Sequence, residues 1–514
     1  ALGPVRVAAP APPGGGFQRW LDGKRALLTR HIEGAIGGNA GGVAAAFATG
    51  DVGGIDPQAA DDFRRSGLAH LLSISGLHVA AVIAATMVLT LRLLALSPWL
   101  ALRWPLTLIA AATGALAGIA YTLLSGAQVP TVRSCVASLL VLGGIALGRE
   151  AMTLRLVATG ALVVLLFRPE ALVGPSFQLS FAAVTAIVAL YENPKVRALA
   201  LKRDESWSRR ILRELLSLLA TGLLVEAALA PIGLYHFHRA GLYGAFANIV
   251  AIPLTTFVVM PAEALALLLD LFGLGTPAWW VAGSALRFLL WIAHRVAILP
   301  GAVAALPSMP LGAFLLMVAG GLWLALWRTR WRRLGAAPLA IGALWALATP
   351  APDLLVTGDG RHLAIRNGDA LHLLRPRAGD YVRELLGWGA GIQATALDLD
   401  AMPNARCGDD ACVATLDRGG RRWRLLATRS AYRTDWEALT RACRWADIAV
   451  SDRRLPQGCR PQWLKLDPAS LGQNGGVSVT LARATVETVN GGDRHPWVIR
   501  STRRPGKAPF RPRR

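Results

Sequence analysis

The chain has 514 residues, of which 54% are hydrophobic and only 17% are charged, against about a quarter charged in a typical soluble protein. Because the charges concentrate toward the two ends and leave the middle nearly free of them, the composition excludes one large soluble domain. The net charge of +22 has two explanations: basic residues that set topology at a lipid surface, or attraction to a polyanion such as nucleic acid.

The chain begins with two segments that precede the long apolar runs. Residues 1–16 are rich in Pro, Gly and Ala and lack an initiator Met or a signal-peptide pattern, so we expect a linker that a further part of the natural protein precedes. Residues 17–75 are amphipathic, with a helix start at Asp56-Pro57. We expect these residues to form helices that lie on the membrane surface.

Ten apolar runs follow and predict a polytopic α-helical membrane bundle over residues 76–349, with about ten spans, give or take one or two. Several runs are shorter than the roughly 20 residues of a straight crossing, so we expect some to be tilted, broken or re-entrant. Pro253 and Pro261 interrupt the seventh run, a pattern typical of a broken helix that lines a cavity. The runs lie near residues 76–91, 104–124, 132–148, 154–168, 173–191, 213–232, 243–269, 278–299, 311–327 and 334–349.

The connections between these runs alternate in charge. Those around 126–131, 169–172, 233–242 and 300–310 hold almost no basic residue except Arg239. By the positive-inside rule the other, basic connections are cytoplasmic, which places residues 17–75 and everything beyond residue 350 on the outer side of a plasma membrane. The basic connections contain Arg92, Arg103, Arg149, Arg155, Lys195, Arg197, Lys202, Arg203, Arg209, Arg210, Arg328, Arg330, Arg332 and Arg333.

Residues 353–500 change to short alternating segments separated by Gly-Asp and Asn-Gly turns, which predicts an exported α/β or α+β domain. The basic residues of 501–514 predict a disordered tail. We expect strands near Leu354–Val356, His362–Ile365, Ala370–Leu374, Trp423–Ala427, Asp447–Val450 and Val477–Leu481, and a helix near Asp435–Trp445.

Four of the five cysteines fall in this domain. In an oxidising compartment we expect disulfides with the most local pairing, Cys407–Cys412 and Cys443–Cys459. A four-Cys zinc site is the alternative, which the C-x4-C spacing fits less well. Cys135 lies within a span, where we expect it to act as a small apolar side chain.

Polar residues interrupt the apolar runs in four places, all near the predicted outer ends of the spans. In chain order these four polar groups are residues 70–79, residues 125–134, residues 177–181, and residues 235–239 with Asn248. Polar side chains at membrane depth are costly and are therefore functional candidates. For any single Ser or Gln, helix capping or an interhelical hydrogen bond is the more frequent role, whereas Arg133 together with the two His of the first group favours function. The candidates are His70, Ser73, Ser75, His78, Gln128, Arg133, Gln178, His236 and Asn248, with Gly76, Gly126, Pro130 and Pro253 as expected points of close approach or breakage.

The string HLLSISGLHV at residues 70–79 resembles the hallmark of the competence domain of the ComEC family of DNA-internalisation proteins. GAQVPTVRS, LGRE, FRPEALVGPSFQLSFAA, APIGLYHF and FANIVAIPL resemble later elements of that family in the same order, so the resemblance covers about residues 25–330. It implies an inner-membrane channel for single-stranded DNA in natural transformation, with the nine polar candidates along the DNA path. It also implies a cytoplasmic motor or single-strand-binding protein, a periplasmic DNA receptor, a homo-oligomer and no cofactor.

Residues 353–500 also resemble the metallo-β-lactamase-like C-terminal domain of this family. A hydrolytic site of that type needs a His-x-His-x-Asp-His cluster to hold metal and activate water. Here His362, His372 and His495 are far apart in sequence, and Asp398-Leu-Asp400 is more typical of a solvated turn than of a metal site. We therefore expect a degenerate domain without metal or catalysis. The resemblance also implies that a nucleic-acid-binding-like domain precedes residue 1.

Two alternative functions fit the same topology. A membrane-linked nuclease acting on incoming DNA would need metal ligands that the sequence does not show, and a transporter for a smaller anion would need no further motif. The sequence contains no Walker A motif, so any pulling force must come from a partner, and no HExxH motif of an intramembrane protease.

Overall fold

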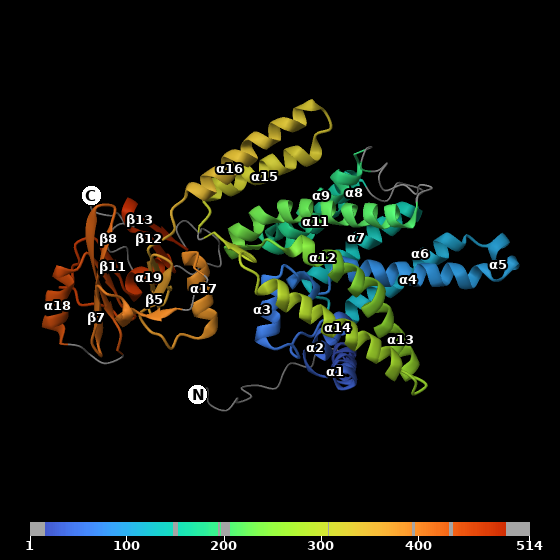
Figure 1. The fold of residues 1–514 in the computed structure, drawn as a ribbon, viewed down its shortest axis with the longest axis horizontal. Coiled ribbons are helices and arrows are strands. Elements are labelled where there is room, and N and C mark those ends of the chain that lie inside the picture. Colours follow the sequence, from blue (N-terminus) through green and yellow to red (C-terminus); the bar gives the residue numbers. More distant parts are fainter. Residues whose placement is uncertain are drawn as a thin grey trace. The chain divides into compact units, whose positions relative to one another are not determined.

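The computed structural model describes residues 16–146, 153–193, 196, 206–306, 308–392, 396–430 and 435–489 (Figure 1). The chain forms two compact units. We call residues 1–233, 240–304 and 321–335 the bundle unit, and residues 234–239, 305–320 and 336–514 the C-terminal unit. The predictions for residues 1–15 and 501–514, and those for Arg149, Lys195, Arg197, Lys202, Arg203 and His495, lie outside the described residues.

The bundle unit begins with three helices, α1 (Gly16–Ile36), α2 (Gly38–Thr49) and α3 (Pro57–Arg65), followed by a short 3-10 turn, η1 (Ala69–Leu71). Asp56 caps α3 and Pro57 occupies its first turn, as predicted. The three helices pack against α14 (Thr276–Ala297). The apolar cluster that joins them contains Ile32, Val43, Phe47, Phe63, Leu71, Leu286 and Leu289.

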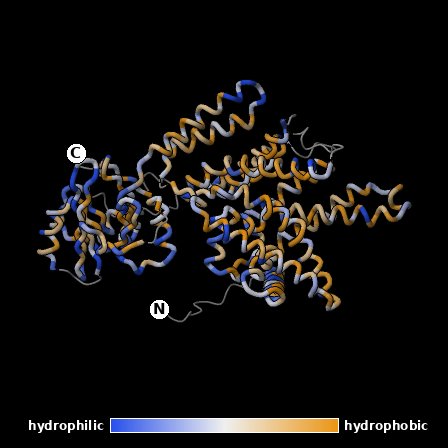
Figure 2. The backbone as a smooth tube through the Cα atoms, viewed as in Figure 1, coloured by the Kyte–Doolittle hydropathy of each residue, from blue (hydrophilic) through white to orange (hydrophobic). Residues whose placement is uncertain are grey.

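Helices occupy all ten predicted apolar runs, and five of them are long and apolar enough to cross a membrane. Figure 2 shows hydrophobic residues along most of their length. The ten-span prediction is therefore supported only in part. The five are α4 (Gly76–Ala95), α6 (Leu106–Leu124), α7 (Val129–Ala146), α11 (Trp207–Phe237) and the continuous helix Gly244–Asp270.

The other apolar helices are shorter or less apolar. Proline limits two of them: Pro169 follows α8, and Pro175 begins α9, with the turn η2 (Pro169–Val173) between them. These helices are α14, described above, and α8 (Leu154–Phe167), α9 (Pro175–Tyr191), α15 (Leu311–Leu326) and α16 (Ala336–Ala348). The connections contain α5 (Pro98–Arg103), η4 (Arg330–Gly335) and a two-stranded sheet of β1 (Arg239–Gly241) and β2 (Val303–Ala305).

Small residues let α4 and α6 pack closely. Gly114 and Gly118 of α6 are four residues apart and face α4. A Cβ atom at Gly114 would lie 2.7 Å from Cγ of Met87, and one at Gly118 would lie 2.8 Å from Cδ1 of Ile83. A side chain at Gly114 would also lie 3.2 Å from the carbonyl oxygen of Ile83, so this position restricts the helix separation more than Gly118, where the Ile83 side chain could shift.

The seventh run is not broken, contrary to the sequence prediction. It continues from α12 (Gly244–Leu254) through a π-helical turn, η3 (Thr255–Val259), into α13 (Met260–Asp270). Pro253 and Pro261 flank this turn and have no N–H to donate. The wider π turn accommodates the missing donors without breaking the helix.

Two β-sheets form the core of the C-terminal domain. The first has the order β13-β12-β3-β4-β5-β6 and is antiparallel except between β5 and β6. The second has the order β11-β10-β9-β8-β7, in which β10 runs parallel to both neighbours. The strands are β3 (Leu354–Val356), β4 (Leu363–Asn367), β5 (Ala370–Leu373), β6 (Leu397–Asp398), β7 (Ala405–Cys407), β8 (Ala411–Arg418), β9 (Arg421–Thr428), β10 (Ile448–Val450), β11 (Leu464–Leu466), β12 (Val477–Thr480) and β13 (Thr485–Thr488).

The domain is layered helix–sheet–sheet–helix, which confirms the predicted α/β class. Side chains of both sheets, among them Ile365 and Leu425, share one apolar cluster. α17 (Asp380–Ala390) packs on the first sheet through Leu386, and α18 (Trp436–Trp445) packs on the second through Cys443. A further short helix, α19 (Pro468–Asn474), packs beside β11.

Both predicted disulfides are present. Cys407 and Cys412 are paired neighbours on β7 and β8, and Cys443 of α18 is bonded to Cys459 in the loop before β11. The four cysteines therefore form disulfides rather than a zinc site. Cys135 is buried and free, as expected.

We expect the two disulfides to differ in their contribution to the stability of this domain. The chain-entropy model gives about 3 kcal/mol for the Cys443–Cys459 bond, which closes the longer loop, and about 2 kcal/mol for Cys407–Cys412. Both double variants should lower the free energy of unfolding, and C443S/C459S should lower it more than C407S/C412S. The measurement is pulse proteolysis of the full chain in urea. C135S is the control and should leave the midpoint of the C-terminal domain unchanged; equal midpoints for all three would contradict the expectation.

Candidate functional site

The HLLSISGLHV segment forms η1 and the start of α4. Ser75 is the N-cap of α4 and forms a capping box with His78, whose Nδ1 lies 3.0 Å from Ser75 Oγ and 3.3 Å from Ser75 N. Ser73 Oγ donates to the carbonyl of His70, at 3.3 Å. Ser75 and His78 therefore interact through their side chains and start the helix, whereas Ser73 contacts the backbone of His70.

The two histidines of this segment have different surroundings. His70 is exposed, and its Nδ1 lies 3.2 Å from the carbonyl oxygen of Gly67. His78 is only 1% exposed, and its ring meets that of Phe47 edge-on at a centroid distance of 4.8 Å. Among the described residues His78 Nε2 has no hydrogen-bond partner. His70 is thus the histidine that an incoming ligand can reach in this arrangement.

The second polar group lies against the first. Thr131 Oγ1 is 3.5 Å from the carbonyl oxygen of Ile74, and Ser134 Oγ is 3.5 Å from where a Cβ atom at Gly76 would stand. Gln128 Nε2 donates to the carbonyl of Gly50 at the end of α2, at 3.1 Å. The start of α7 is therefore fixed beside the start of α4.

The turn between α6 and α7 explains two of the expected hinge residues. Gly126 has a φ of 86°, a conformation that favours glycine, and Pro130 is in the first turn of α7. Arg25 of α1 donates from Nε to the carbonyl of Leu124, at 2.8 Å, and so satisfies the end of α6.

Arg133 joins the second group to the third. Its Nη2 donates to the carbonyl and to Oγ of Ser176 at the start of α9, at 2.9 and 3.0 Å. Its buried Nε has no partner among the described residues. Gln178, two residues further on, donates to the carbonyl of Leu172 at 3.0 Å. The start of α7 thus contacts the first polar group through Thr131 and Ser134, and the third through Arg133.

The fourth group is divided between the two units. The backbones of Gly67 and Gly244 are in close contact: a Cβ atom added at Gly67 would lie 2.7 Å from Cα of Gly244. Beside them, Glu226 of α11 accepts the N–H of Ala245 at 3.1 Å. Asn248 lies one turn further along α12, with Oδ1 unpartnered among the described residues. His236 belongs to the C-terminal unit, where its ring meets those of its two chain neighbours and Phe314.

The opposite ends of the spans also meet. Glu192, after α9, accepts from Arg328 at 2.7 Å and from the N–H of Leu154 at 3.2 Å. Glu192 and Arg328 lie in connections that the charge pattern assigns to one membrane face, and Leu154 is the first residue of α8.

Sequence reasoning missed several residues that the structure places at this site. Phe47, Gly50 and Gly67 belong to the segment read only as surface helices, and Ser176 carries no signal on its own. Glu226 had a signal, because it is an acidic residue in the middle of a long apolar run.

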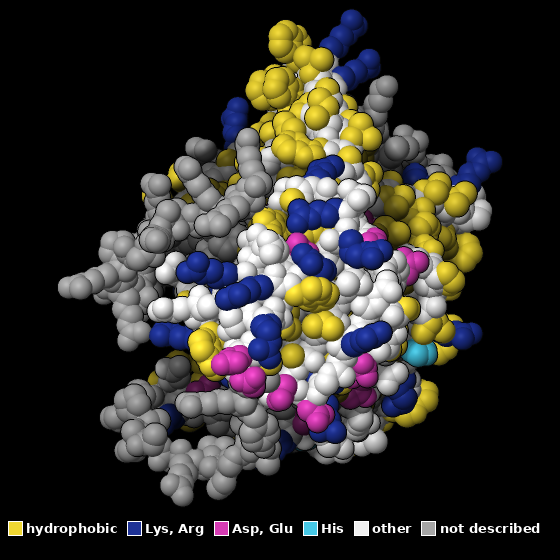
Figure 3. Space-filling model, turned by 90° about the vertical axis from the view of Figure 1, so that its left-hand side faces the viewer, with side chains coloured by type: hydrophobic (Ala, Val, Ile, Leu, Met, Phe, Trp, Pro, Cys, Tyr) yellow, Lys and Arg dark blue, Asp and Glu magenta, His cyan; other side chains and the backbone are white. Residues whose placement is uncertain are grey.

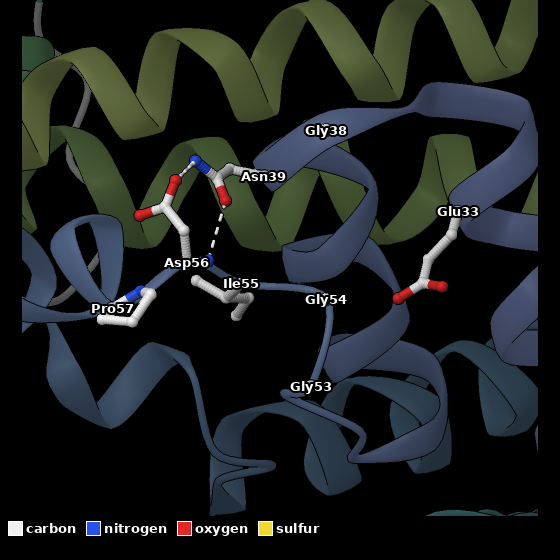
Figure 4. Close-up of a pocket in the computed structure, with 8 residues that line it drawn as sticks. All are labelled: Glu33, Gly38, Asn39, Gly53, Gly54, Ile55, Asp56 and Pro57. Atoms are coloured by element: carbon white, nitrogen blue, oxygen red, sulfur yellow. Dashed lines mark hydrogen bonds between the residues drawn. The ribbon is translucent and has the colours of Figure 1, made fainter. Parts of the chain in front are cut away.

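A surface depression of about 600 Å³ lies between α2 and α3 (Figure 4). Asn39 and Asp56 turn toward one another, with Glu33 on the far side of Gly54. Asn39 donates to Asp56 through its side chain and accepts the N–H of Asp56 at 2.9 Å. These bonds fix the start of α3, so we assign the depression a structural role.

The polar residues of the C-terminal domain form turns and ion pairs. Asp398 caps a 3-10 turn by accepting the N–H of Asp400 and pairs with Arg429 at 3.1 Å, and Asp400 accepts the N–H of Cys407. His372 contacts the carbonyl of Asp398 at 3.2 Å. Within the described part of the chain, no three His, Cys, Asp or Glu side chains gather as metal ligands would.

Comparison with known proteins identifies relatives of the helical part of the chain. A family model described as "Competence protein" matches residues 47–331. "Uncharacterized protein YcaI" of Escherichia coli is 30% identical over 60% of this chain, "Competence protein ComA" of Neisseria gonorrhoeae is 32% identical over 56%, and "ComE operon protein 3" of Bacillus subtilis is 26% identical over 44%. The matches span 40%, 39% and 26% of those proteins, and no solved structure matches.

The capping box predicts a specific loss of stability. Ser75→Ala removes the N-cap of α4 and should cost about 1 kcal/mol, whereas Ser75→Thr should retain most of the stability. The measurement is the denaturant midpoint for proteolysis near residue 76 in detergent-solubilised protein. Ser73→Ala is the matched control, and a loss as large as that of Ser75→Ala would show that the cap is not the cause.

Asp56 predicts a pH dependence at the start of α3. The backbone N–H of Ala59, followed by the Asn39 side chain, holds the pKa of Asp56 below its usual 3.8. Its stabilising effect is therefore complete above 3.8 and is lost as the pH falls through the lower folded-state value. As the pH falls below 3.8, the rate of cleavage around α3 by an acid-active protease should rise in the wild type. The rate should change less in Asp56→Asn, because Asn caps the helix without ionising. Asp61→Asn is the control and should retain the wild-type response.

Proposed function

The chain belongs to the competence protein family, and we propose that it acts in DNA uptake, as an inner-membrane channel that admits single-stranded DNA to the cytoplasm. The observation that carries this proposal is that the start of α7 contacts two other polar groups, the first through Thr131 and Ser134 and the third through Arg133, at span ends that the charge pattern assigns to the outer face. The printed names of the gonococcal and Bacillus relatives support a competence role, although the chain spans two fifths or less of their length.

The chemistry of Arg133 suits a phosphate chain. Single-stranded DNA carries one charge per nucleotide, and its passage through a bilayer requires a wetted path with positive potential. A guanidinium is permanently charged and offers several donors in one plane. Nε of Arg133 is buried without a partner among the described residues, so a local rearrangement would expose a donor for a ligand while Nη2 holds Ser176.

The other polar candidates would line the path with weaker donors and acceptors. His70, Ser73, Gln128 and Gln178 would contact the strand without holding it tightly, which suits conduction. In this structure His78 is covered by Phe47, so a path along His78 opens only when Phe47 or the start of α4 moves. We therefore propose that the present arrangement is a closed state.

We propose further that the C-terminal domain is exported and metallo-β-lactamase-like. Its two disulfides support an oxidising compartment, and its helix–sheet–sheet–helix layers support the fold type. The missing His-x-His-x-Asp-His motif favours a role other than hydrolysis. Figure 3 shows Lys and Arg side chains spread over one side of this domain, which favours contact with a polyanion.

The remaining parts of the proposal follow from the family and the charge pattern. Residues 17–75 would lie on the outer face, residues 76–349 would form the transmembrane domain, and residues 353–500 would form the exported domain. A cytoplasmic motor or single-strand-binding protein would draw the strand inward, and a periplasmic receptor would deliver it, with a second copy of the chain as a further partner.

Substitution of Arg133 tests the channel. Arg133→Ala should reduce cytoplasmic arrival of labelled DNA in a transformable host by about tenfold or more, because a charge-assisted hydrogen bond contributes about 1.5–3 kcal/mol. Arg133→Lys should recover part of the uptake. Membrane insertion is checked by the amount of full-length protein in the membrane fraction.

Arg168→Ala is the matched control, because it removes one exposed basic residue after α8, beside a connection assigned to the same face. It should leave uptake near the wild-type level. Normal uptake in stably inserted Arg133→Ala, or an equal loss in Arg168→Ala, would contradict the assignment of Arg133 to the DNA path.

A further inference from the structure

The buried stripe of α13 contains one acidic side chain. Glu263 is 5% exposed and lies about one turn from Val259 and from Ala266, both of which are fully buried. Those two residues belong to the apolar cluster that also contains Phe47 of α2 and Leu286 of α14. The carboxyl group of Glu263 therefore faces an apolar interior at membrane depth.

No cation in the described part of the bundle unit pairs with Glu263. Its Oε1 has no hydrogen-bond partner among the described residues, and the ion pairs there involve other acids. The α2 segment carries no charged side chain at all. The hydroxyl of Tyr121 of α6 donates to the carbonyl of Phe47, at 2.5 Å, and not to Glu263.

The basic and titratable groups on the other helices near α13 are engaged elsewhere. On α14, Arg287 donates to Ser284 Oγ, His294 pairs with Asp62, and Arg295 stacks on its neighbour Trp291. On α4, Nδ1 of His78 is held by the capping box, and its Nε2 has no hydrogen-bond partner among the described residues, Glu263 included. At the far end of α13, His31 of α1 pairs with Asp270.

An ionised carboxylate in this place would be far more costly than a neutral one. Burial of a charge without a partner costs several kcal/mol, and the group instead takes up a proton. Glu226 shows the contrast, because its carboxylate accepts a backbone N–H at the start of α12. Glu263 lacks such a donor at Oε1.

We propose that Glu263 is a proton-binding site within the helix bundle. Its carboxyl group carries a proton while α13 packs against α2 and α14, and it releases that proton when the packing opens and water reaches it. The π turn η3 lies immediately before α13, flanked by Pro253 and Pro261, and is a place where this helix can bend. Proton binding would then accompany a change in the shape of the bundle.

The test is chemical modification of the full chain in detergent or lipid vesicles. Dicyclohexylcarbodiimide is apolar and reacts with protonated carboxyl groups: the carboxyl oxygen adds to the carbodiimide carbon, its proton moves to nitrogen, and an acyl shift leaves a stable N-acylurea. Peptide mapping by mass spectrometry should find this adduct on Glu263. The rate should fall as the pH rises, because only the protonated form reacts, and the adduct should be absent in Glu263→Gln.

Glu192 is the internal comparison, because it pairs with Arg328 and should label much more slowly. An unlabelled Glu263 in a mapped peptide, or labelling no faster than that of Glu192, would overturn the proposal.

Infrared difference spectra of wild type and Glu263→Gln give a second readout without a reagent. Loss of a protonated-carboxyl C=O band supports the proposal, and loss of carboxylate bands alone refutes it. Neither measurement uses DNA, so the result is independent of the proposed channel.

Discussion

The rest of the structure depends on one constraint: inside an apolar bundle, every polar group must find its partner within the protein. The contacts at the predicted outer ends of the spans follow from it. Ser75 and His78 satisfy the start of α4, Glu226 satisfies the start of α12, and Arg25 satisfies the end of α6. Glycines make these contacts possible, because Gly67 meets Gly244 at a separation that no larger residue permits. The result is a set of helix ends bound to one another by polar contacts.

The same constraint separates structural from functional polar residues. Ser75 has its hydrogen bonds within the fold, so its presence needs no ligand to explain it. Arg133 and Asn248 differ, because each keeps a buried polar atom without a partner among the described residues. Such atoms are costly unless something else satisfies them at another stage of the protein's activity. A passing phosphate chain would do so for Arg133, and a bound proton is the simplest solution for Glu263.

The C-terminal domain satisfies its polar groups in a different way, by pairing. Asp447 is buried between Arg421 and Arg424, Arg418 pairs with Asp353, and Arg429 pairs with Asp398. These pairs and two disulfides stabilise the domain. Asp398 and Asp400 are the closely spaced carboxylates of this domain that could be considered as metal ligands. Asp398 instead caps a 3-10 turn, and Asp400 accepts the N–H of Cys407 at the end of β7.

The sequence alone determined the helical bundle, the α/β class of the C-terminal domain, the two disulfides and the start of α3, because apolar runs, alternation, cysteine spacing and Asp-Pro are local patterns. It also located the polar groups, because they interrupt the apolar runs. Tertiary structure decided what the sequence left open. It kept the seventh run continuous, since a π turn absorbs Pro253 and Pro261. It buried His78 under Phe47 and gave Glu263 an apolar setting. These outcomes depend on contacts between residues far apart in the chain, and no local pattern encodes which side chain will lie against which.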